Sequence, residues 1–203
     1  MKKNIYYVMF GLVLFCSCKN TKPEIESIRI AYYNYIFETS ESINCDDIKV
    51  TTLPSFENIL VYDSKKKDSI VESYIDYQAI FDTIITNSIL LKKIEDELIL
   101  LKTNDSLKSI DSRISATILY KNGKEEKLCI GGIFTNVILY NGQIQETNNK
   151  LLYLIKNNIG YYNWISTEDI EYMDELNDTS FEKEPFVEST YYKRYIEAES
   201  KMQ

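Results

Sequence analysis

Alternating apolar and polar positions predict strands in the first third of the chain. The stretch Ile25–Phe37 is rich in Ile, Tyr and Phe and contains no glycine or proline. Ile28, Ile30 and Tyr32 would share one face of such a strand, while Arg29 and its alternate neighbours would share the other. We therefore predict a long strand that is buried on one side and partly covered on the other. Ile59–Tyr62, which ends in a turn, and the β-branched stretch Ser69–Thr86 are also expected to be extended.

Apolar side chains spaced three and four residues apart predict a helix at Ser88–Lys102. Its apolar stripe consists of Leu90, Leu91, Ile94, Leu98 and Leu101, and its cap is one of Thr86, Asn87 and Ser88. Glu95 and Asp96 lie off the stripe, so we expect them on a solvated face rather than in a catalytic pair. A second helix is predicted at Asn148–Asn157, capped by Thr147 and ended by a left-handed residue at Asn158 or Gly160.

Two Asn-Gly pairs, Asn122-Gly123 and Asn141-Gly142, predict β-hairpins between the helices. At the first pair, a two-residue loop would place apolar side chains beside charged ones. A three-residue loop with Gly123 left-handed keeps apolar partners on one face instead. Because a one-residue slip moves every side chain to the other face, burial should select the three-residue loop. The expected pairs are Ile114 with Ile130, Ala116 with Leu128 and Ile118 with Glu126.

The last part of the chain predicts smaller elements. Tyr161–Ile165 is expected to form a last strand, and Ser166–Leu176 a short acidic helix. Residues 177–203 form a charged tail, which we expect to be the least ordered part, with a surface helix at Thr190–Glu199. Together these elements predict one α+β domain over residues 25–176, an antiparallel sheet with two main helices packed on one face.

The first seventeen residues have the order of charge, apolar run and small residue that is typical of an export signal. Lys2 and Lys3 precede the uncharged stretch Ile5–Phe15. As a helix, these eleven residues would span roughly 16 Å, about half the hydrocarbon thickness of a bilayer. We therefore predict a signal peptide at residues 1–17 and not a transmembrane helix.

The residues that follow, Phe15-Cys16-Ser17-Cys18, resemble the lipobox of bacterial lipoproteins. Phe15 stands where that family usually has Leu. The resemblance implies cleavage before Cys18, a lipid on its sulfur and residues 18–24 as a tether; an ordinary cleaved signal with a free Cys18 is the alternative. Composition and lipobox together are similar to small lipoproteins of Bacteroidota-type bacteria, in which an acidic run after the cysteine often directs surface export. Lys19–Lys22 contains no acid, so we expect an anchor in the cell envelope, in the outer membrane and facing the periplasm.

Composition excludes several classes of function. Without residues 1–17, which hold two lysines and no acid, the chain has 21 basic and 31 acidic residues and a net charge of −10. Such a surface repels nucleic acid and favours a basic protein partner. The chain has no histidine, which removes Ser-His-Asp catalysis and His-zinc sites. No cofactor and no metal site are expected, and we predict that the protein is not an enzyme.

Cys45 and Cys129 are the two cysteines that follow the signal stretch. In an oxidising periplasm they are candidates for a disulfide, which would close a loop of about 85 residues and stabilise the fold by about 4.5 kcal/mol on the chain-entropy model. Two separate buried thiols are the alternative.

Other clusters are weaker candidates for a site. The carboxylates of Asp46-Asp47, of Asp63 and Asp68, and of Asp174, Glu175 and Asp178 lack the ligand ladder of a calcium loop, so we expect caps or solvated loops. Trp164 beside Tyr161 and Tyr162 would form either an exposed aromatic patch or a plug in the core, and we favour the plug.

Three hypotheses on function follow. The first is a non-catalytic binding lipoprotein, for example an immunity factor against a basic toxin; the second is a structural or assembly lipoprotein of the envelope. The third and weakest is a carboxylate-dependent hydrolase, which would need a pocket with two inward-facing acids.

The lipobox gives the first testable prediction. Mass spectrometry of the protein from the membrane fraction is expected to show an acylated Cys18 as the first residue, because two or more acyl chains anchor stably where one is marginal. An unacylated Cys18, or a mature protein that retains residues 1–17, would contradict the anchor.

Overall fold

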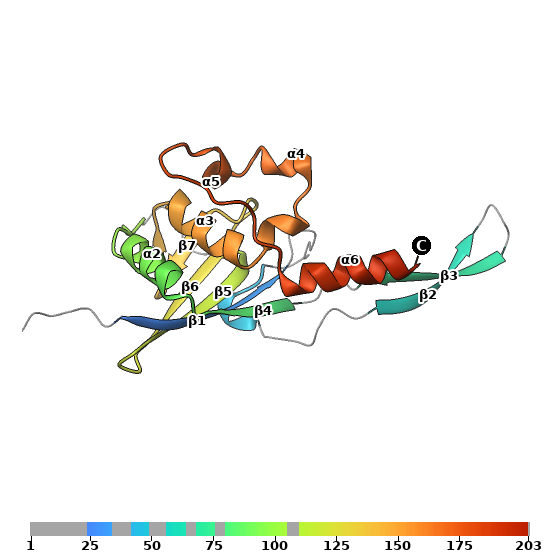
Figure 1. Cartoon of the computed structure of the whole chain (residues 1–203), viewed down its shortest axis with the longest axis horizontal. Coiled ribbons are helices and arrows are strands. Elements are labelled where there is room, and N and C mark those ends of the chain that lie inside the picture. The colour runs from blue at the N-terminus through green and yellow to red at the C-terminus, as the bar shows by residue number, and fades with distance from the viewer. Residues whose placement is uncertain are drawn as a thin grey trace, which may run out of the picture.

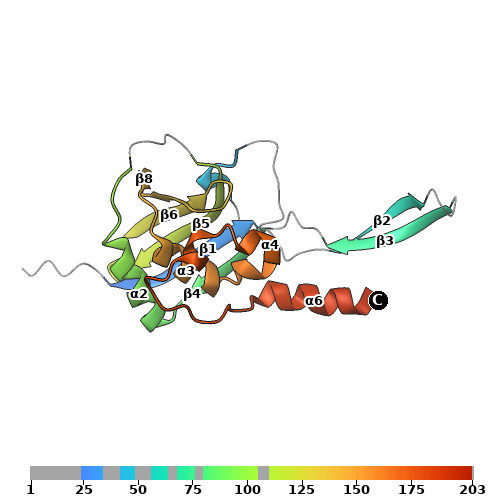
Figure 2. The ribbon, with the colours of Figure 1, turned by 90° about the horizontal axis from the view of Figure 1, so that it is seen from above.

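The structure is a computed structural model, and it describes residues 24–33, 42–48, 56–63, 68–75, 80–104 and 110–202. The predicted signal peptide, Cys18 and all of the tether except Glu24 lie outside the described residues. The main body is a six-stranded antiparallel sheet in the order β4-β1-β5-β6-β7-β8 (Figure 1). Its strands are β1 (Ile25–Tyr33), β4 (Ile80–Ile85), β5 (Ser112–Tyr120), β6 (Glu125–Gly131), β7 (Val137–Tyr140) and β8 (Gln143–Gln145). A separate hairpin of β2 (Phe56–Asp63) and β3 (Asp68–Ile75) extends from this body (Figure 2).

Two helices, α2 (Ser88–Leu98) and α3 (Asn149–Asn158), pack against each other and lie over the same face of the sheet (Figure 1). The predicted α+β fold is therefore confirmed. The shorter helical elements are η1 (Cys45–Asp47), η2 (Tyr161–Trp164), α4 (Thr167–Ile170) and α5 (Asp174–Asn177). A last helix, α6 (Thr190–Met202), projects from the body (Figure 2).

The first hairpin has the predicted register. Ile114 pairs with Ile130, Ala116 with Leu128 and Ile118 with Glu126, and Gly123 has φ +81°. Burial of one apolar face therefore selected the three-residue loop, as expected. The second Asn-Gly turn joins β7 to β8 with Asn141 and Gly142 at positive φ, which suits a two-residue hairpin loop.

Strand β1 lies inside the sheet and has two unlike faces. Ile28, Ile30 and Tyr32 are at most 1% exposed and face the helices, as predicted. On the opposite face Arg29 is exposed, whereas Ala31 is covered by Ile48 from the segment after η1. As far as Tyr33, this is the predicted strand, buried on one side and partly covered on the other; its predicted residues 34–37 lie outside the described residues.

Several predicted boundaries are wrong for local reasons. The α2 cap is Asn87, one of the three predicted, but the helix ends at Leu98 instead of Lys102. Helix α3 is capped by Asn148 and not Thr147, because the Asn148 amide oxygen accepts the hydrogen bond from Leu151 N.

The predicted strand at Tyr161–Ile165 is also wrong, because these residues form the 3-10 helix η2. Gly160, at φ +70°, ends α3 in the left-handed conformation and turns the chain into η2. Trp164 is 5% exposed and stacks on Phe81 with ring centroids 4.9 Å apart, which confirms the core plug. The predicted helix at Ser166–Leu176 is broken into α4 and α5, with Ser166 capping the first.

The two candidate cysteines are joined in a disulfide, with Cα atoms 5.9 Å apart. The bond ties η1 to β6 in the sheet. Ile43 supports this attachment, because its N–H donates to Asp111 Oδ1 at 2.8 Å and its carbonyl accepts from Ser112 N at 2.8 Å. The disulfide therefore fastens the segment that covers the face of the sheet opposite the helices.

Residues 178–189, which we name the strap, lie across α3 and join α5 to α6. Val187 N donates to Asn157 Oδ1 at 3.0 Å, and Phe181 packs on Tyr153 with ring centroids 5.6 Å apart. The predicted domain boundary at residue 176 therefore falls inside the packed body. The helix predicted at Thr190–Glu199 corresponds to the first ten residues of α6.

The core contains one ion pair that the sequence pattern did not predict. Lys156 Nζ lies 2.6 Å from Glu175 Oε1, and both side chains are 0% exposed. Tyr162 OH donates to the same Oε1 at 3.1 Å. Burial lowers the pKa of Lys156, while the charge of Glu175 and its hydrogen bond oppose that shift. The expectation that Glu175 belongs to a cap or solvated loop was wrong: it fastens α5 to α3.

This pair gives a stability prediction. Lys156→Met should reduce the free energy of unfolding by about 3–5 kcal/mol, because it leaves a buried carboxylate without its cation. The double variant Lys156→Met, Glu175→Leu should reduce the free energy of unfolding much less, since it removes both charges. Urea unfolding of each variant measures the difference, and equal losses in the single and double variants would show that the two charges are not coupled.

Candidate functional site

The two edges of the sheet differ. The β8 edge is covered by residues 102–104: Asn104 N donates to Ile144 O at 2.8 Å, and Glu146 N donates to Lys102 O at 2.7 Å. At the other edge, β4 pairs with β1 and with no second strand among the residues that the structure describes. In an antiparallel ladder alternate residues bond to one neighbour, so the others in β4 direct N–H and C=O groups away from β1.

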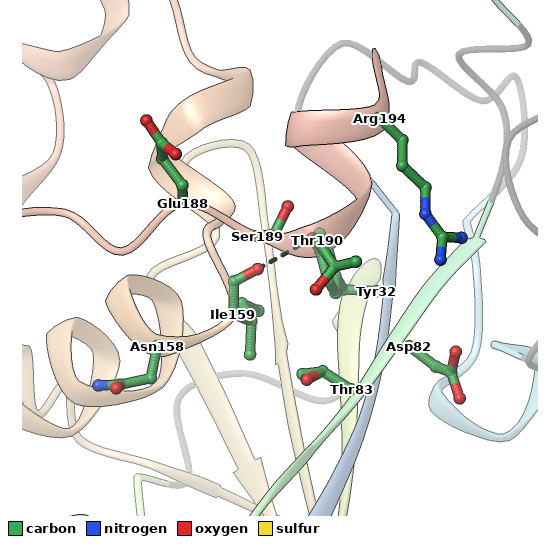
Figure 3. Close-up of a pocket in the computed structure, with 9 residues that line it drawn as sticks. All are labelled: Tyr32, Asp82, Thr83, Asn158, Ile159, Glu188, Ser189, Thr190 and Arg194. Carbon is green, nitrogen blue, oxygen red and sulfur yellow. Dashed lines mark hydrogen bonds between the residues drawn. The ribbon is translucent and has the colours of Figure 1, made fainter. Parts of the chain in front are cut away.

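Two adjoining hollows lie on the helix side of the sheet, and the first of them borders β4. The first, of about 420 Å³, lies between β4, the end of α3 and the start of α6 (Figure 3). The second, of about 530 Å³, lies between the start of α2, α3 and the strap. Asn158 lines both hollows, so they adjoin. We name the two together the edge furrow.

The first hollow is built on a buried hydrogen bond. Tyr32 is 0% exposed, and its hydroxyl donates to the carbonyl of Ile159 at 3.0 Å (Figure 3). Thr83 contributes from β4, and Thr190 and Arg194 contribute from α6. Asn158 adds an amide and Glu188 a carboxylate, so the hollow offers hydroxyls, an amide and charges of both signs to a ligand.

Gly160 is required for this arrangement. A Cβ atom at this position would lie 2.5 Å from Ser189 N, and the residue has φ +70°. A larger residue would therefore strain the backbone and also push the strap off the end of α3.

The second hollow is more apolar and is bordered by ion pairs. Ile89, at the start of α2, is 70% exposed. Lys93 Nζ lies 3.0 Å from Glu184 Oε1, and Tyr153 OH donates to the Glu184 carbonyl. Lys150 pairs with Glu97 at 2.8 Å. The lysines of this hollow are thus neutralised by nearby acids, which leaves hydrogen bonding and apolar contact as its main chemistry.

A third hollow, of about 270 Å³, lies at the far end of the sheet and contains Glu95 and Glu126. Glu95 is 8% exposed and pairs with Lys92 at 2.9 Å, so the expectation of a solvated Glu95 was wrong. Glu126 accepts hydrogen bonds from Tyr120 OH at 2.5 Å, from Tyr140 OH and from Lys124 Nζ. Burial alone would raise the pKa of Glu126, but these three donors together bring it below its usual value. This carboxylate is therefore held in the charged form and is not arranged as a proton donor near neutral pH.

Several other residues singled out in the sequence lie away from the edge furrow, while Cys18 and the side chains of Asp63 and Asp68 are outside what the structure describes. Cys45 and Cys129 are on the covered face of the sheet, and Asp46 pairs with Lys127 on the surface. Asp178 is held by Ser180 and Asn149, and hydrogen bonds from both lower its pKa to about 2. Among the described ranges no group of three or more residues of the kinds that bind metals comes together. The furrow itself had no sequence signal, because its residues come from β1, β4, α2, α3, the strap and α6, which are far apart in the chain.

The body is therefore an α+β domain in which residues 102–104 cover one sheet edge, while β4, at the other edge, has a strand on one side only among the described residues. No protein-family model, curated protein or solved structure matches the chain. Within the described part of the chain, every helix is too short or too polar to cross a bilayer.

The tyrosine–glutamate cluster gives a pH prediction. Burial, and then the hydrogen bond to Glu126, raises the pKa of Tyr120 from 10.0 to about 12. The folded state therefore keeps a proton that the unfolded chain loses near pH 10. This stabilisation is complete below pH 10 and is lost as the pH rises from 10 to about 12. Urea unfolding across this range should show that the difference in the free energy of unfolding between wild type and Tyr120→Phe becomes smaller as the pH rises. A difference in the free energy of unfolding that stays constant with pH would contradict the raised pKa of Tyr120.

Proposed function

We propose that this protein is a non-catalytic binding lipoprotein of the cell envelope, and that it binds an extended segment of a basic protein along β4. The observation that carries the proposal is that, among the residues the structure describes, β4 has a neighbouring strand on one side only and lies beside the edge furrow. An extended peptide that adds to such an edge gains main-chain hydrogen bonds, and pockets beside the edge receive its side chains. An edge of this kind is a ready template for pairing with another chain.

The charge of the chain favours a basic partner over a second copy of itself. At a net charge of −10 without residues 1–17, two copies repel one another, whereas a basic protein is attracted at long range. The same charge keeps the domain away from anionic headgroups. The partner is thus expected to be a soluble or periplasmic protein with a positively charged segment.

The proposed anchor places the open edge within reach of such a partner. Six residues lie between Cys18 and Ile25, which makes seven residue-to-residue steps. Fully extended, they reach at most about 25 Å, so the start of β1 would stay close to the membrane. β4 runs antiparallel to β1 and its first residue, Ile80, pairs with Tyr33. The edge furrow therefore begins at the end of β1 that is farther from the anchor.

Ile84 allows a direct test, because its side chain is 58% exposed on β4. A lysine at an edge strand discourages strand addition, so Ile84→Lys should abolish capture of a basic partner from the organism's own envelope extract. Wild type should retain that partner at low salt and release it at high salt. Amide exchange should also slow in Ile80–Ile85 when the partner is bound.

Ile99→Lys is the matched control, since Ile99 is 50% exposed on the surface after α2 and receives the same change of charge. The proposal fails if Ile84→Lys and Ile99→Lys retain the partner equally, or if no protein is retained. Slower exchange confined to other strands would also overturn it. Broad envelope defects on deletion, without a retained partner, would favour the structural or assembly alternative.

A further inference from the structure

The strap contacts the body in the way that a bound peptide contacts its receptor. Val187 N donates to Asn157 Oδ1 at 3.0 Å, and the carbonyl of Val187 accepts from Asn163 Nδ2 at 3.1 Å. Two side-chain amides therefore bind both main-chain groups of one strap residue, as a neighbouring strand does at a hydrogen-bonded pair of an antiparallel sheet. Asn157 is only 2% exposed, so its position is fixed by the packing of α3.

Two aromatic side chains of the strap pack on tyrosines of the same surface. The ring of Phe181 lies on Tyr153 of α3, with centroids 5.6 Å apart. The ring of Phe186 lies on Tyr162 of η2, with centroids 4.9 Å apart. Aromatic side chains of this kind supply much of the contact area in peptide and protein interfaces.

An ion pair and a proline lie between the two aromatic residues. The carboxylate of Glu184 is 3.0 Å from Lys93 Nζ of α2, and its carbonyl accepts a hydrogen bond from Tyr153 OH. Pro185 has a fixed φ and favours extended backbone at Glu184 before it. We name the surface that receives the strap the strap groove; it consists of Lys93, Tyr153, Asn157, Tyr162 and Asn163.

The strap is attached at the surface of the body and does not fill the space beneath it. Phe186 and Val187 are 45% and 41% exposed, and the side chain of Glu184 is 72% exposed. The second hollow, of about 530 Å³, lies between the strap and helices α2 and α3. A segment with few buried apolar contacts opens at a lower free energy than the core beside it. We therefore expect the strap to open while the body stays folded.

Both ends of the strap are fastened to its own body. Before it, Glu175 of α5 forms the buried pair with Lys156 at 2.6 Å. After it, Tyr192 of α6 packs edge to face with Trp164, with centroids 5.5 Å apart. The strap would therefore open as a loop. These attachments, and the net charge of −10 without residues 1–17, disfavour exchange of straps between two copies.

We infer that the strap is a displaceable ligand of the strap groove, and that the groove receives an extended segment of another protein in its place. The strap itself defines that segment. It carries an aromatic residue, an acidic residue three positions later and a second aromatic residue two positions after that, as Phe181, Glu184 and Phe186 do. This inference goes beyond the proposed function, because it concerns a different surface and a segment with an acidic residue.

The probe is a fluorescently labelled peptide with the sequence of residues 178–189. The variant Glu184→Lys, Phe186→Ala weakens the resident strap and leaves every residue of the groove unchanged, so fluorescence anisotropy should show that it binds the probe. Wild type should bind about tenfold more weakly, because its own strap competes at an effective concentration in the millimolar range. The control Glu171→Lys, Tyr172→Ala makes the same changes at exposed residues outside the strap and should bind like wild type.

A charge reversal at Lys93 tests whether the probe lies in the groove. Added to the strap variant, Lys93→Glu should weaken the probe about twofold to fivefold, as expected for one exposed ion pair. It should strengthen a probe that has lysine in place of Glu184 by a similar factor. Lys121→Glu, at a 58% exposed side chain outside the groove, should affect both probes alike. If Lys93→Glu also affects both probes alike, the proposed position of the acidic residue is wrong.

Amide exchange of the wild type measures whether the strap opens alone. The N–H of Val187 should exchange through an opening that leaves the amides of α3 protected. If it exchanges no faster than they do, the strap opens only when the whole body unfolds, and the inference is overturned.

The remaining outcomes separate this inference from the proposed function. Equal binding of the probe by the strap variant and its control, or binding by neither, would overturn the inference and leave the capture experiment with Ile84→Lys unaffected. A wild-type dimer that the strap variant cannot form would make a second copy the occupant and overturn the assignment to another protein. Ile84→Lys should leave probe binding unchanged; if it abolishes binding, the probe lies at β4 and not in the strap groove.

Discussion

The hydrogen bond from Tyr32 to the carbonyl of Ile159 holds the two layers of the body together where the edge furrow begins. Its partners are 127 residues apart, one in the sheet and the other at the C-terminal end of α3. Both groups are buried, so losing the bond would leave a polar group unsatisfied, at about 1–3 kcal/mol. The ring of Tyr32 also packs on Phe81 and on Tyr161, at centroid distances of 5.5 and 6.0 Å. Strand β4, the end of α3 and η2 therefore take their positions from one side chain of β1.

Local pattern was enough to predict the elements whose burial decides their geometry. The register of the hairpin that turns at Gly123 could be predicted, because only one loop length placed Ala116 and Leu128 on the same apolar face. The strand predicted at Tyr161–Ile165 was wrong, because this apolar run fits a strand or a buried helical turn equally well. Only Gly160 and the packing of Trp164 on Phe81 decide between the two.

The sequence pattern did not predict the charged residues in the core at all. Lys156 and Glu175 are 19 residues apart and belong to different helices. A charge in an amphipathic sequence is normally assigned to the solvent, because burying it alone is costly. Only the packing of α5 on α3 shows that each charge has a partner.

The edge furrow was beyond sequence prediction for a different reason. Whether a strand lies at an edge is a property of the whole sheet, and β4 has the apolar, β-branched composition of an interior strand. Its neighbours in the furrow, Asn158 and Ser189, are more than seventy residues away in the chain. The strap that brings Ser189 there was itself predicted to be an irregular tail.

Two contacts outside the furrow fasten the layers on either side of the sheet. The disulfide between Cys45 and Cys129 fastens the layer on one face of the sheet, and the Lys156–Glu175 pair fastens the helices on the other. β4 lies at the edge between these two fixed layers, paired to β1 over all six of its residues. A partner segment would then lose its own freedom on binding, while the edge would lose little. Under the proposed function, long-range charge would bring a basic segment to the surface, and β4, held between these two layers, would bind it there.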